Sequence, residues 1–314
     1  MHEPLIKIIE KYETIAIFRH VYPDGDALGS QFGLKSWIQS HYPNKKVVAL
    51  GKQGDDLINF PIPDAISDEE LKEACAIVVD TANTDRIDDE RYKLCQYLIK
   101  IDHHPLAEEY GDLSIVLERA SATCEIITSL LMVYGKTCSK ETATYLYCGL
   151  LTDTLQLSIP SVTKVTLNCA AFLAECGVDI AACNEAMFSS TLTKFKYDAY
   201  LKNHCQIIDG KIAYMIVDQK TYESFGLTFL QAKENVGALS KVIDFEMWAL
   251  FTQNPHEEGI CYNGSLRSKR IQINDIASLY HGGGHKLAAG VKQLTANDIS
   301  ELLDKLKNRL FENQ

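Results

Sequence analysis

Carboxylate and imidazole side chains recur in four short segments of this 314-residue chain. The segments are His20-Val-Tyr-Pro-Asp24-Gly-Asp26, the single Asp80, the triplet Asp102-His103-His104, and the single Asp153. Such side chains supply oxygen and nitrogen ligands to divalent cations. Two neighbouring cations can activate a water and hold phosphoryl oxygens, so the pattern predicts one hydrolytic centre with two metal ions.

The charge of this predicted cluster explains why metals are expected in it. Carboxylates that lie close together repel and raise one another's pKa unless a positive charge lies among them. Two divalent cations would neutralise the cluster. A set of Asp and His ligands in which oxygen predominates favours Mn²⁺ and is compatible with Mg²⁺, Co²⁺, Fe²⁺ or Zn²⁺, whereas Ca²⁺ prefers oxygen alone.

Short apolar runs predict the strands that position these residues. The predicted strands of the first half are 14–19, 46–50, 75–80 and 97–101, and a helix is predicted over 27–41. This β-α-β order indicates an α/β fold with a mainly parallel sheet. The carboxyl ends of parallel strands meet in one crevice, so His20, Asp80 and Asp102 are expected to lie close together.

Helices are predicted to follow this sheet, at 123–134, 140–150 and 162–176. Asp153 would lie just beyond the second of them. Ser121 and Thr123 stand before the first helix and are candidates to cap it or to contact a substrate. Gly177 would end the third as a C-terminal glycine.

The rest of the chain predicts a smaller second domain. We expect domains at 1–190 and 204–314, joined by a polar linker helix over 191–203. Two strand-like runs within 205–217 flank Asp209-Gly210, which is a strong hairpin signal. Further strands are predicted over 245–252 and 258–266, and helices over 273–279 and 296–310.

Composition and charge limit the classes of function. With 31 Lys and Arg against 42 Asp and Glu, the net charge is −11, which argues against binding of long nucleic acid. The ten cysteines form no CxxC pair, which favours buried free thiols in a reducing cytoplasm. No apolar run is long enough to cross a membrane and no secretory signal is evident, so a cytoplasmic protein is expected. The oligomeric state has no signature in the sequence.

The four segments together resemble the motifs of the DHH phosphoesterase superfamily, which is named after the triplet found here at Asp102-His103-His104. His20 to Ser30 resembles motif I, Asp80 motif II and Asp153 motif IV, while Gly282-Gly283-Gly284-His285 resembles the signature of the associated DHHA1 domain. The chain is most similar to the two-domain, NrnA-like branch of nano-RNases and 3′-phosphoadenosine 5′-phosphate (pAp) phosphatases. The resemblance implies an N-terminal DHH domain whose parallel sheet is flanked by helices, facing a smaller α/β DHHA1 domain across a cleft.

The same resemblance implies a role for each site residue. One metal would be held by His20, Asp24 and Asp80, and the other by Asp26, Asp80, His103 and Asp153. The catalytic group would comprise the bridging Asp80, His104 facing the substrate, and Asp102 orienting the histidines. In the second domain Ser265, Arg267, Gly282, Gly283, Gly284 and His285 would bind the substrate, because glycine amides approach anions closely and an arginine fork grips phosphate.

The resemblance thus implies a metal-dependent phosphohydrolase acting on short 5′-phosphorylated oligoribonucleotides and on pAp. One alternative is a family II-type inorganic pyrophosphatase, which shares the DHH motifs. Others are a phosphodiesterase acting on cyclic-di-AMP or pApA, and a nucleotide- or RNA-binding module that does not hydrolyse its ligand.

Overall fold

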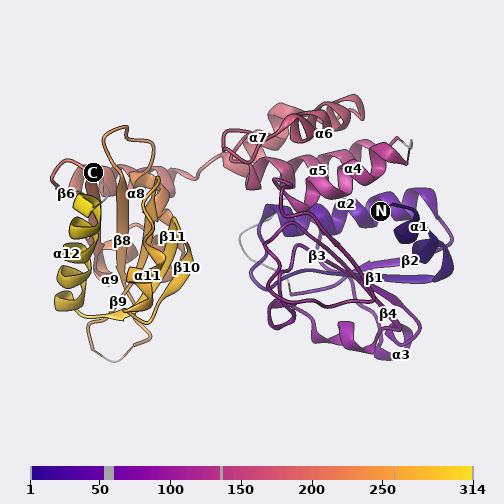
Figure 1. The fold of residues 1–314 in the computed structure, drawn as a ribbon, viewed down its shortest axis with the longest axis horizontal. Coiled ribbons are helices and arrows are strands. Elements are labelled where there is room, and N and C mark those ends of the chain that lie inside the picture. Colours follow the sequence, from indigo (N-terminus) through magenta and orange to yellow (C-terminus); the bar gives the residue numbers. More distant parts are fainter. Residues whose placement is uncertain (1, 53–59, 135–136, 258, 313–314) are drawn as a thin grey trace. The chain divides into compact units, whose positions relative to one another are not determined.

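The computed structural model describes residues 2–52, 60–134, 137–257 and 259–312. The chain divides into two compact units, Met1–Ser189 and Ser190–Gln314, which are described separately (Figure 1). Residue 258, the first of one predicted strand, lies outside the described residues.

The first unit is built on a five-stranded sheet of order β2-β1-β3-β4-β5, in which every neighbouring pair is parallel. The strands are β1 (Thr14–Phe18), β2 (Lys46–Ala49), β3 (Cys75–Val79), β4 (Tyr97–Asp102) and β5 (Leu113–Val116). Central strand β3 is buried at every position. This continuous burial explains its unbroken apolar run, because helices and loops cover both faces of a parallel sheet.

Helices cover one face of this sheet in successive layers. They are α1 (His2–Lys11), α2 (Gly25–His41), α4 (Thr123–Val133), α5 (Lys140–Asp153), α6 (Lys164–Glu175) and α7 (Ile180–Phe188). Figure 1 shows α4 to α7 beyond α2 on this side and the short α3 (Asp68–Leu71) on the other. Ile15, Ile77 and Ile99 pack in the core under the first group, and Phe18 and Val78 pack in the core of the opposite face.

Helices α2 and α5 approach each other closely through glycine. A Cβ added at Gly29 would lie 2.6 Å from the Tyr145 carbonyl oxygen and 3.0 Å from the Gly149 Cα. The two backbones therefore touch where these glycines meet. This contact brings the first turn of α2, which carries Asp26, near the last turn of α5, which carries Asp153.

We predict that Gly29→Ala destabilises the first unit by about 1–3 kcal/mol, because the added methyl group overpacks a backbone contact. Chemical denaturation of the full chain, followed by circular dichroism, measures this loss. Gly237→Ala is the matched control, since a Cβ at Gly237 meets no atom within 4 Å. Equal stability of Gly29→Ala and the wild type would contradict the prediction.

The predicted strands and main helices of this unit are confirmed, but four of its described α-helices and strands were not predicted from the sequence. They are α1, α3, β5 and α7. Strand β5 is short and only partly buried, so its sequence carries little hydrophobic signal. Helix α5 also extends three residues past its predicted end, which places Asp153 within the helix and not beyond it.

The second unit contains a six-stranded sheet of order β10-β11-β9-β8-β7-β6. Its strands are β6 (Gln206–Ile208), β7 (Ile212–Val217), β8 (Met247–Gln253), β9 (Tyr262–Ser268), β10 (Gly283–His285) and β11 (Ala288–Leu294). Only β7 and β8 pair in parallel. The predicted hairpin joins β6 and β7, and both turn residues, Asp209 and Gly210, have the positive φ angles that such a turn requires.

Helices pack on both faces of the second sheet. They are α8 (Leu192–His204), α9 (Gln219–Ser224), α10 (Phe229–Glu234), α11 (Asn274–Ser278) and α12 (Ala296–Glu312). Tyr197 and Leu201 of α8, the helix expected as a linker, are fully buried in a core with Val217 and Leu250. The opposite core joins α11 and α12 to Leu266 and Val291.

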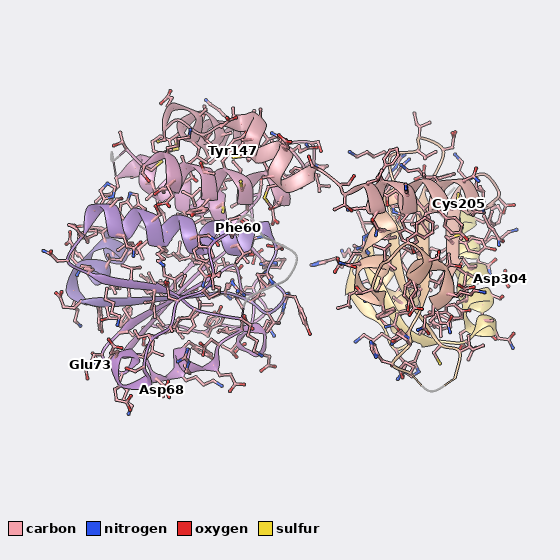
Figure 2. All side chains as sticks on the ribbon, turned by 180° about the vertical axis from the view of Figure 1, so that it is seen from behind. Phe60, Asp68, Glu73, Tyr147, Cys205 and Asp304 are labelled. Atoms are coloured by element: carbon pink, nitrogen blue, oxygen red, sulfur yellow. The ribbon has the colours of Figure 1, made fainter. Side chains whose placement is uncertain are left out.

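Three further properties concern the surface charges, the cysteines and the length of the helices. Figure 2 shows Asp68, Glu73 and Asp304 on the outside of the molecule, where water screens their negative charges. All ten cysteines are free thiols, and six of them are buried. Within the described ranges no single helix is long and apolar enough to span a bilayer; α6 and α7 reach that threshold only together, bent by 114°.

Candidate metal centre

The structure brings the four predicted segments together at the carboxyl edge of the first sheet. His20, Asp24 and Asp80 form one group whose ligand atoms all lie within 4.8 Å of one another. His20 follows β1, and its Nε2 lies 3.4 Å from Asp80 Oδ2 and 3.9 Å from Asp24 Oδ1. Asp24 caps helix α2, accepting hydrogen bonds from the amides of Asp26 and Ala27.

A second group combines Asp26, His103 and Asp153, again with ligand atoms within 4.8 Å of one another. The His103 Nε2 lies 3.2 Å from Asp153 Oδ2 and 4.0 Å from Asp26 Oδ2. Asp26 is fully buried, and its carboxylate accepts hydrogen bonds from the Thr123 and Cys124 amides at 2.6 and 2.9 Å. These amides begin α4, so the helix N-terminus stabilises the negative charge of Asp26.

Asp80 lies between the two groups. Its Oδ2 lies near His20, while its Oδ1 is 3.6 Å from the His103 Nε2. Asp80 directly follows β3 and has a left-handed backbone with φ 53°. The two oxygens of one carboxylate therefore face the two separate groups, as a bridging ligand would.

The hydrogen bonds of both histidines leave Nε2 available. His20 Nδ1 lies 2.8 Å from the Val21 carbonyl oxygen, and His103 Nδ1 lies 3.3 Å from the Ala120 carbonyl oxygen. A carbonyl only accepts, so each Nδ1 carries the proton. In the neutral ring each Nε2 then carries the lone pair and faces the carboxylates, which is the arrangement of metal-binding histidines.

The carboxylates of the site favour a bound positive charge. Burial, together with the charges of Asp80 and Asp153, raises the pKa of the Asp26 carboxyl well above its usual range. Burial by itself would lower the pKa of His103, but its hydrogen bond to Asp153 and the charges of Asp26 and Asp80 raise it to about 10. Asp26 and His103 thus bind protons more tightly than the free side chains where no cation is present.

The two neighbouring histidines of the triplet have different partners. His104 Nδ1 lies 2.8 Å from Asp102 Oδ1, and the His104 amide donates to the same oxygen. His104 also joins Asp80 and His103 in a third group of potential ligands. However, its Nδ1–H is engaged by Asp102, whereas His103 Nε2 faces Asp26 and Asp153, the other members of its ligand group. The geometry therefore favours His103 as the ligand.

Two further contacts lie at the start of α4, where the sequence suggested Ser121 and Thr123 as helix caps or substrate contacts. Ala122 occupies the N-cap position of α4, but its side chain forms no capping hydrogen bond. The Asp26 carboxylate from α2 caps this helix instead. The Thr123 hydroxyl donates to Asp80 Oδ1 at 3.0 Å. Thr123 therefore orients Asp80, and the expectation that Ser121 or Thr123 caps α4 is wrong because a distant carboxylate takes that position.

In the second unit the register of three strands brings most of the predicted substrate residues together. His285 pairs with Ala288, which pairs with Arg267, and Gly283 pairs with Gly290, which pairs with Ser265. Directly opposed residues share one face of a sheet. His285, Arg267 and Ser265 therefore lie on the face opposite the core residue Leu266. Edge strand β10 contains Gly283 and Gly284 of the predicted glycine run, and Gly282 directly precedes it.

A lysine that the sequence did not single out, Lys233, lies near both Arg267 and a second lysine, Lys292. Burial lowers the pKa of Lys233, and the positive charges of Lys292 and Arg267 lower it further, while the charge of Glu234 opposes them. Lys233 comes from α10 and Lys292 from β11. Within the described part of the chain, Arg267 forms no ion pair with a carboxylate and donates to the Leu266 carbonyl oxygen. We call Lys233, Arg267 and Lys292 the basic group; it is a potential anion site.

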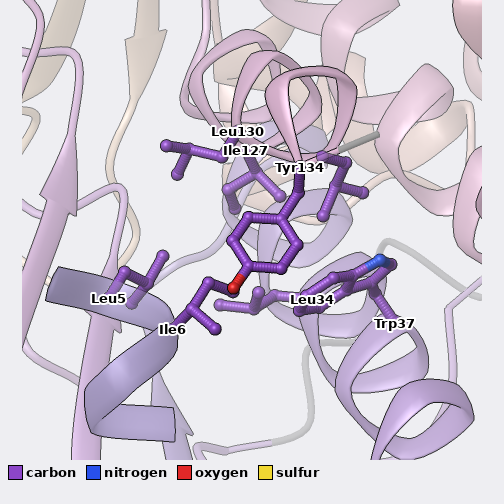
Figure 3. Close-up of a pocket in the computed structure, with 8 residues that line it drawn as sticks. Leu5, Ile6, Leu34, Trp37, Ile127, Leu130 and Tyr134 are labelled. Atoms are coloured by element: carbon purple, nitrogen blue, oxygen red, sulfur yellow. The ribbon is translucent and has the colours of Figure 1, made fainter. Parts of the chain in front are cut away.

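An apolar cavity in the first unit is too small to be a substrate site. It lies among α1, α2 and α4, is lined by residues including Leu5, Trp37 and Tyr134 (Figure 3), and has a volume of about 10 Å³. This is about the volume that one water requires. This cavity is therefore no alternative to the Asp and His groups as a reaction site.

Two domain families match separate parts of the chain. Residues 14–150 match the DHH family, N-terminal domain, and residues 209–312 match the DHHA1 domain. A probable bifunctional oligoribonuclease and PAP phosphatase NrnA from Streptococcus mutans is 38% identical over 302 residues, covering 96% of this chain and 96% of the relative. This chain belongs to the NrnA-like branch of the DHH family.

Further comparisons support the assignment of this DHH protein. The bifunctional oligoribonuclease and PAP phosphatase NrnA of Bacillus subtilis is 32% identical over 317 residues, covering both chains completely. An exopolyphosphatase-related protein from Bacteroides fragilis has a similar structure, with a TM-score of 0.87 at 21% identity over 99% of this chain and 97% of that one. The expected α/β fold, with DHH before DHHA1, is confirmed.

Proposed function

We propose that this protein is a metal-dependent phosphoesterase that hydrolyses short 5′-phosphorylated oligoribonucleotides and pAp. The observation that carries the proposal is the position of Asp80, whose two oxygens face two separate groups of Asp and His ligands. The relatives named oligoribonuclease and PAP phosphatase, aligned over almost the full length, support the substrate class.

The donor set fits two divalent cations. We propose that His20, Asp24 and Asp80 hold one, and that Asp26, Asp80, His103 and Asp153 hold the other. Oxygen predominates in both sets, which favours Mn²⁺. When bound, such cations polarise a phosphoryl group and make a water nucleophilic at neutral pH.

The protein's own side chains account for the remaining tasks. Asp80 connects the two groups and is oriented by the Thr123 hydroxyl. Asp102 holds His104 through Nδ1, which leaves His104 Nε2 to stabilise the phosphoryl charge or to protonate the leaving oxygen. In the second unit we propose that the basic group, Ser265, His285 and the amides of Gly282, Gly283 and Gly284 bind a substrate phosphate.

A product-resolved assay tests this function. The purified protein is incubated with Mn²⁺ and pAp, pApA, cyclic-di-AMP, pyrophosphate or a ladder of short 5′-phosphorylated RNAs. We expect the fastest turnover with pAp or the shortest RNAs. Faster turnover of pyrophosphate would favour the pyrophosphatase alternative, and tight nucleotide binding without any cleavage would favour a binding module.

We predict that Arg267→Ala lowers kcat/KM for pAp by about 10–100-fold, because a hydrogen bond to a charged group contributes roughly 1.5–3 kcal/mol. The loss is expected mainly in KM, since Arg267 lies in the second unit and outside the groups of metal ligands. Steady-state kinetics on pAp measure it. Arg270→Ala serves as control, because the Arg270 side chain is 79% exposed; equal kinetics of both variants would refute the role of Arg267.

A further inference from the structure

A fully buried lysine lies beside the candidate metal centre. Lys100 is 0% exposed and occupies β4 between Ile99 and Ile101, whose side chains face the helices. Side chains alternate along a strand, so Lys100 faces the opposite side of the sheet. Burial of an ammonium costs several kcal/mol unless charges and hydrogen-bond acceptors compensate for it.

The surroundings of Lys100 supply that compensation. Its Nζ donates to the Ala82 carbonyl oxygen at 2.8 Å and to the Glu108 carbonyl oxygen at 3.2 Å. It lies 4.4 Å from the centroid of the Tyr110 ring, within the range of a cation–π interaction. It also forms an ion pair of 3.6 Å with Asp102 Oδ2.

The contact with Asp102 links Lys100 to His104. Lys100 and Asp102 are two residues apart in β4 and therefore share one face. Asp102 is also 0% exposed; its Oδ1 accepts from His104, while its Oδ2 has no hydrogen-bond partner in the described structure. The Lys100 ammonium is thus the positive charge beside an oxygen that would otherwise be buried and uncompensated.

Lys100 also stabilises the segment after Asp80. Ala82, whose carbonyl oxygen accepts from Lys100, lies two residues beyond Asp80, and Tyr110 donates to the intervening Thr81 carbonyl oxygen at 2.6 Å. The left-handed backbone of Asp80 costs roughly 1–3 kcal/mol and persists only where its surroundings hold it. One ammonium therefore supports the two loops that carry Asp80 and His104.

We propose that Lys100 is a positioning residue of the phosphoesterase reaction. Its ammonium holds the Asp102 carboxylate against His104 Nδ1, so that His104 presents Nε2 to the substrate. The identity of the reaction rests on the proposed function, whereas the contacts among Lys100, Asp102 and His104 are properties of the geometry and can be tested without substrate.

The test replaces Lys100 by Met and, in a second variant that keeps polarity, by Gln. We expect kcat for pAp to fall about 10–100-fold, the usual effect of losing an outer partner of a site, while KM changes by less than about twofold. NMR of ¹⁵N-histidine-labelled protein is expected to show a changed His104 Nδ1–H signal in both variants. Lys35→Met is the control, because Lys35 pairs with Asp64 at 2.6 Å in another part of the unit.

A double-mutant cycle separates positioning from general support of the fold. In an Asp102→Asn background we expect Lys100→Met to lower kcat by no more than about twofold further, because the contact is already lost. Lys100→Arg, which keeps the charge, should retain more activity than Lys100→Met. Folded Lys100 variants with wild-type kcat and an unchanged His104 signal, or fully additive losses in the cycle, would overturn the proposal. A wild type that cleaves no phosphoester would overturn the proposed function instead, and the NMR comparison would still test the contact.

Discussion

Replacing Asp80 by Asn is expected to lower kcat for pAp and for short RNA by at least about 10³-fold. Asp80 contributes one oxygen to each of two ligand groups, 3.4 Å from His20 Nε2 and 3.6 Å from His103 Nε2. An amide can offer one neutral oxygen but cannot bridge as an anion. A loss of several kcal/mol of transition-state stabilisation corresponds to this fall in kcat.

The measurement is steady-state hydrolysis of pAp and of a 5′-phosphorylated dinucleotide, with thermal melting as a check on folding. Asp85→Asn is the matched control, because Asp85 is an exposed aspartate of the same unit. We expect Asp85→Asn to keep the wild-type rate. A folded Asp80→Asn protein that retains a tenth or more of wild-type activity would contradict the bridging role.

Removal of divalent cations is expected to abolish hydrolysis and to destabilise the first unit selectively. Three carboxylates, Asp26, Asp80 and Asp153, surround His103 at distances of 3.2 to 4.0 Å. A cation present at 100 times its Kd stabilises the folded state by about 2.7 kcal/mol. For a unit of this size the melting temperature should therefore rise by roughly 5–10 °C when Mn²⁺ is restored.

The pH dependence of cation binding follows from His103. Its pKa is raised to about 10 in the protein without metal, so the ring is protonated at neutral pH. A cation requires the neutral ring and must displace this proton. The affinity for Mn²⁺ should therefore increase with pH, by about tenfold per unit below the pKa for each proton released. Calorimetric titration in buffers of different pH measures this increase; affinity that is independent of pH would contradict it.

The strand-end residues of the site could be predicted because a local pattern marks them. Asp80 directly follows the apolar run that forms β3, and Asp102 ends β4. A parallel sheet then brings such ends to one edge, whatever lies between them in the sequence. The hairpin at Asp209-Gly210 was predictable for a similar reason, since its turn requires residues that tolerate positive φ.

The contacts that complete the site could not be predicted in this way, because they join segments without any shared pattern. Asp26 caps helix α4 by bonding the Thr123 amide, 97 residues further along the chain. From the sequence alone, Lys100 would be assigned to the exposed face of an alternating strand. Its contacts with Asp102, Tyr110 and the surrounding carbonyl oxygens become visible only in the structure. Lys233 joins Arg267 through the packing of α10 on the second sheet, whereas Lys292 belongs to β11, the strand that pairs with β9 of Arg267.

The central claim, that six Asp and His side chains hold two cations, is tested most directly by anomalous diffraction from crystals grown with Mn²⁺. The account predicts two manganese peaks in the first unit, one beside His20 and Asp24 and one beside His103 and Asp153, with Asp80 touching both. Crystals of active protein with no anomalous peak among these residues, or with manganese bound elsewhere in the chain, would contradict it.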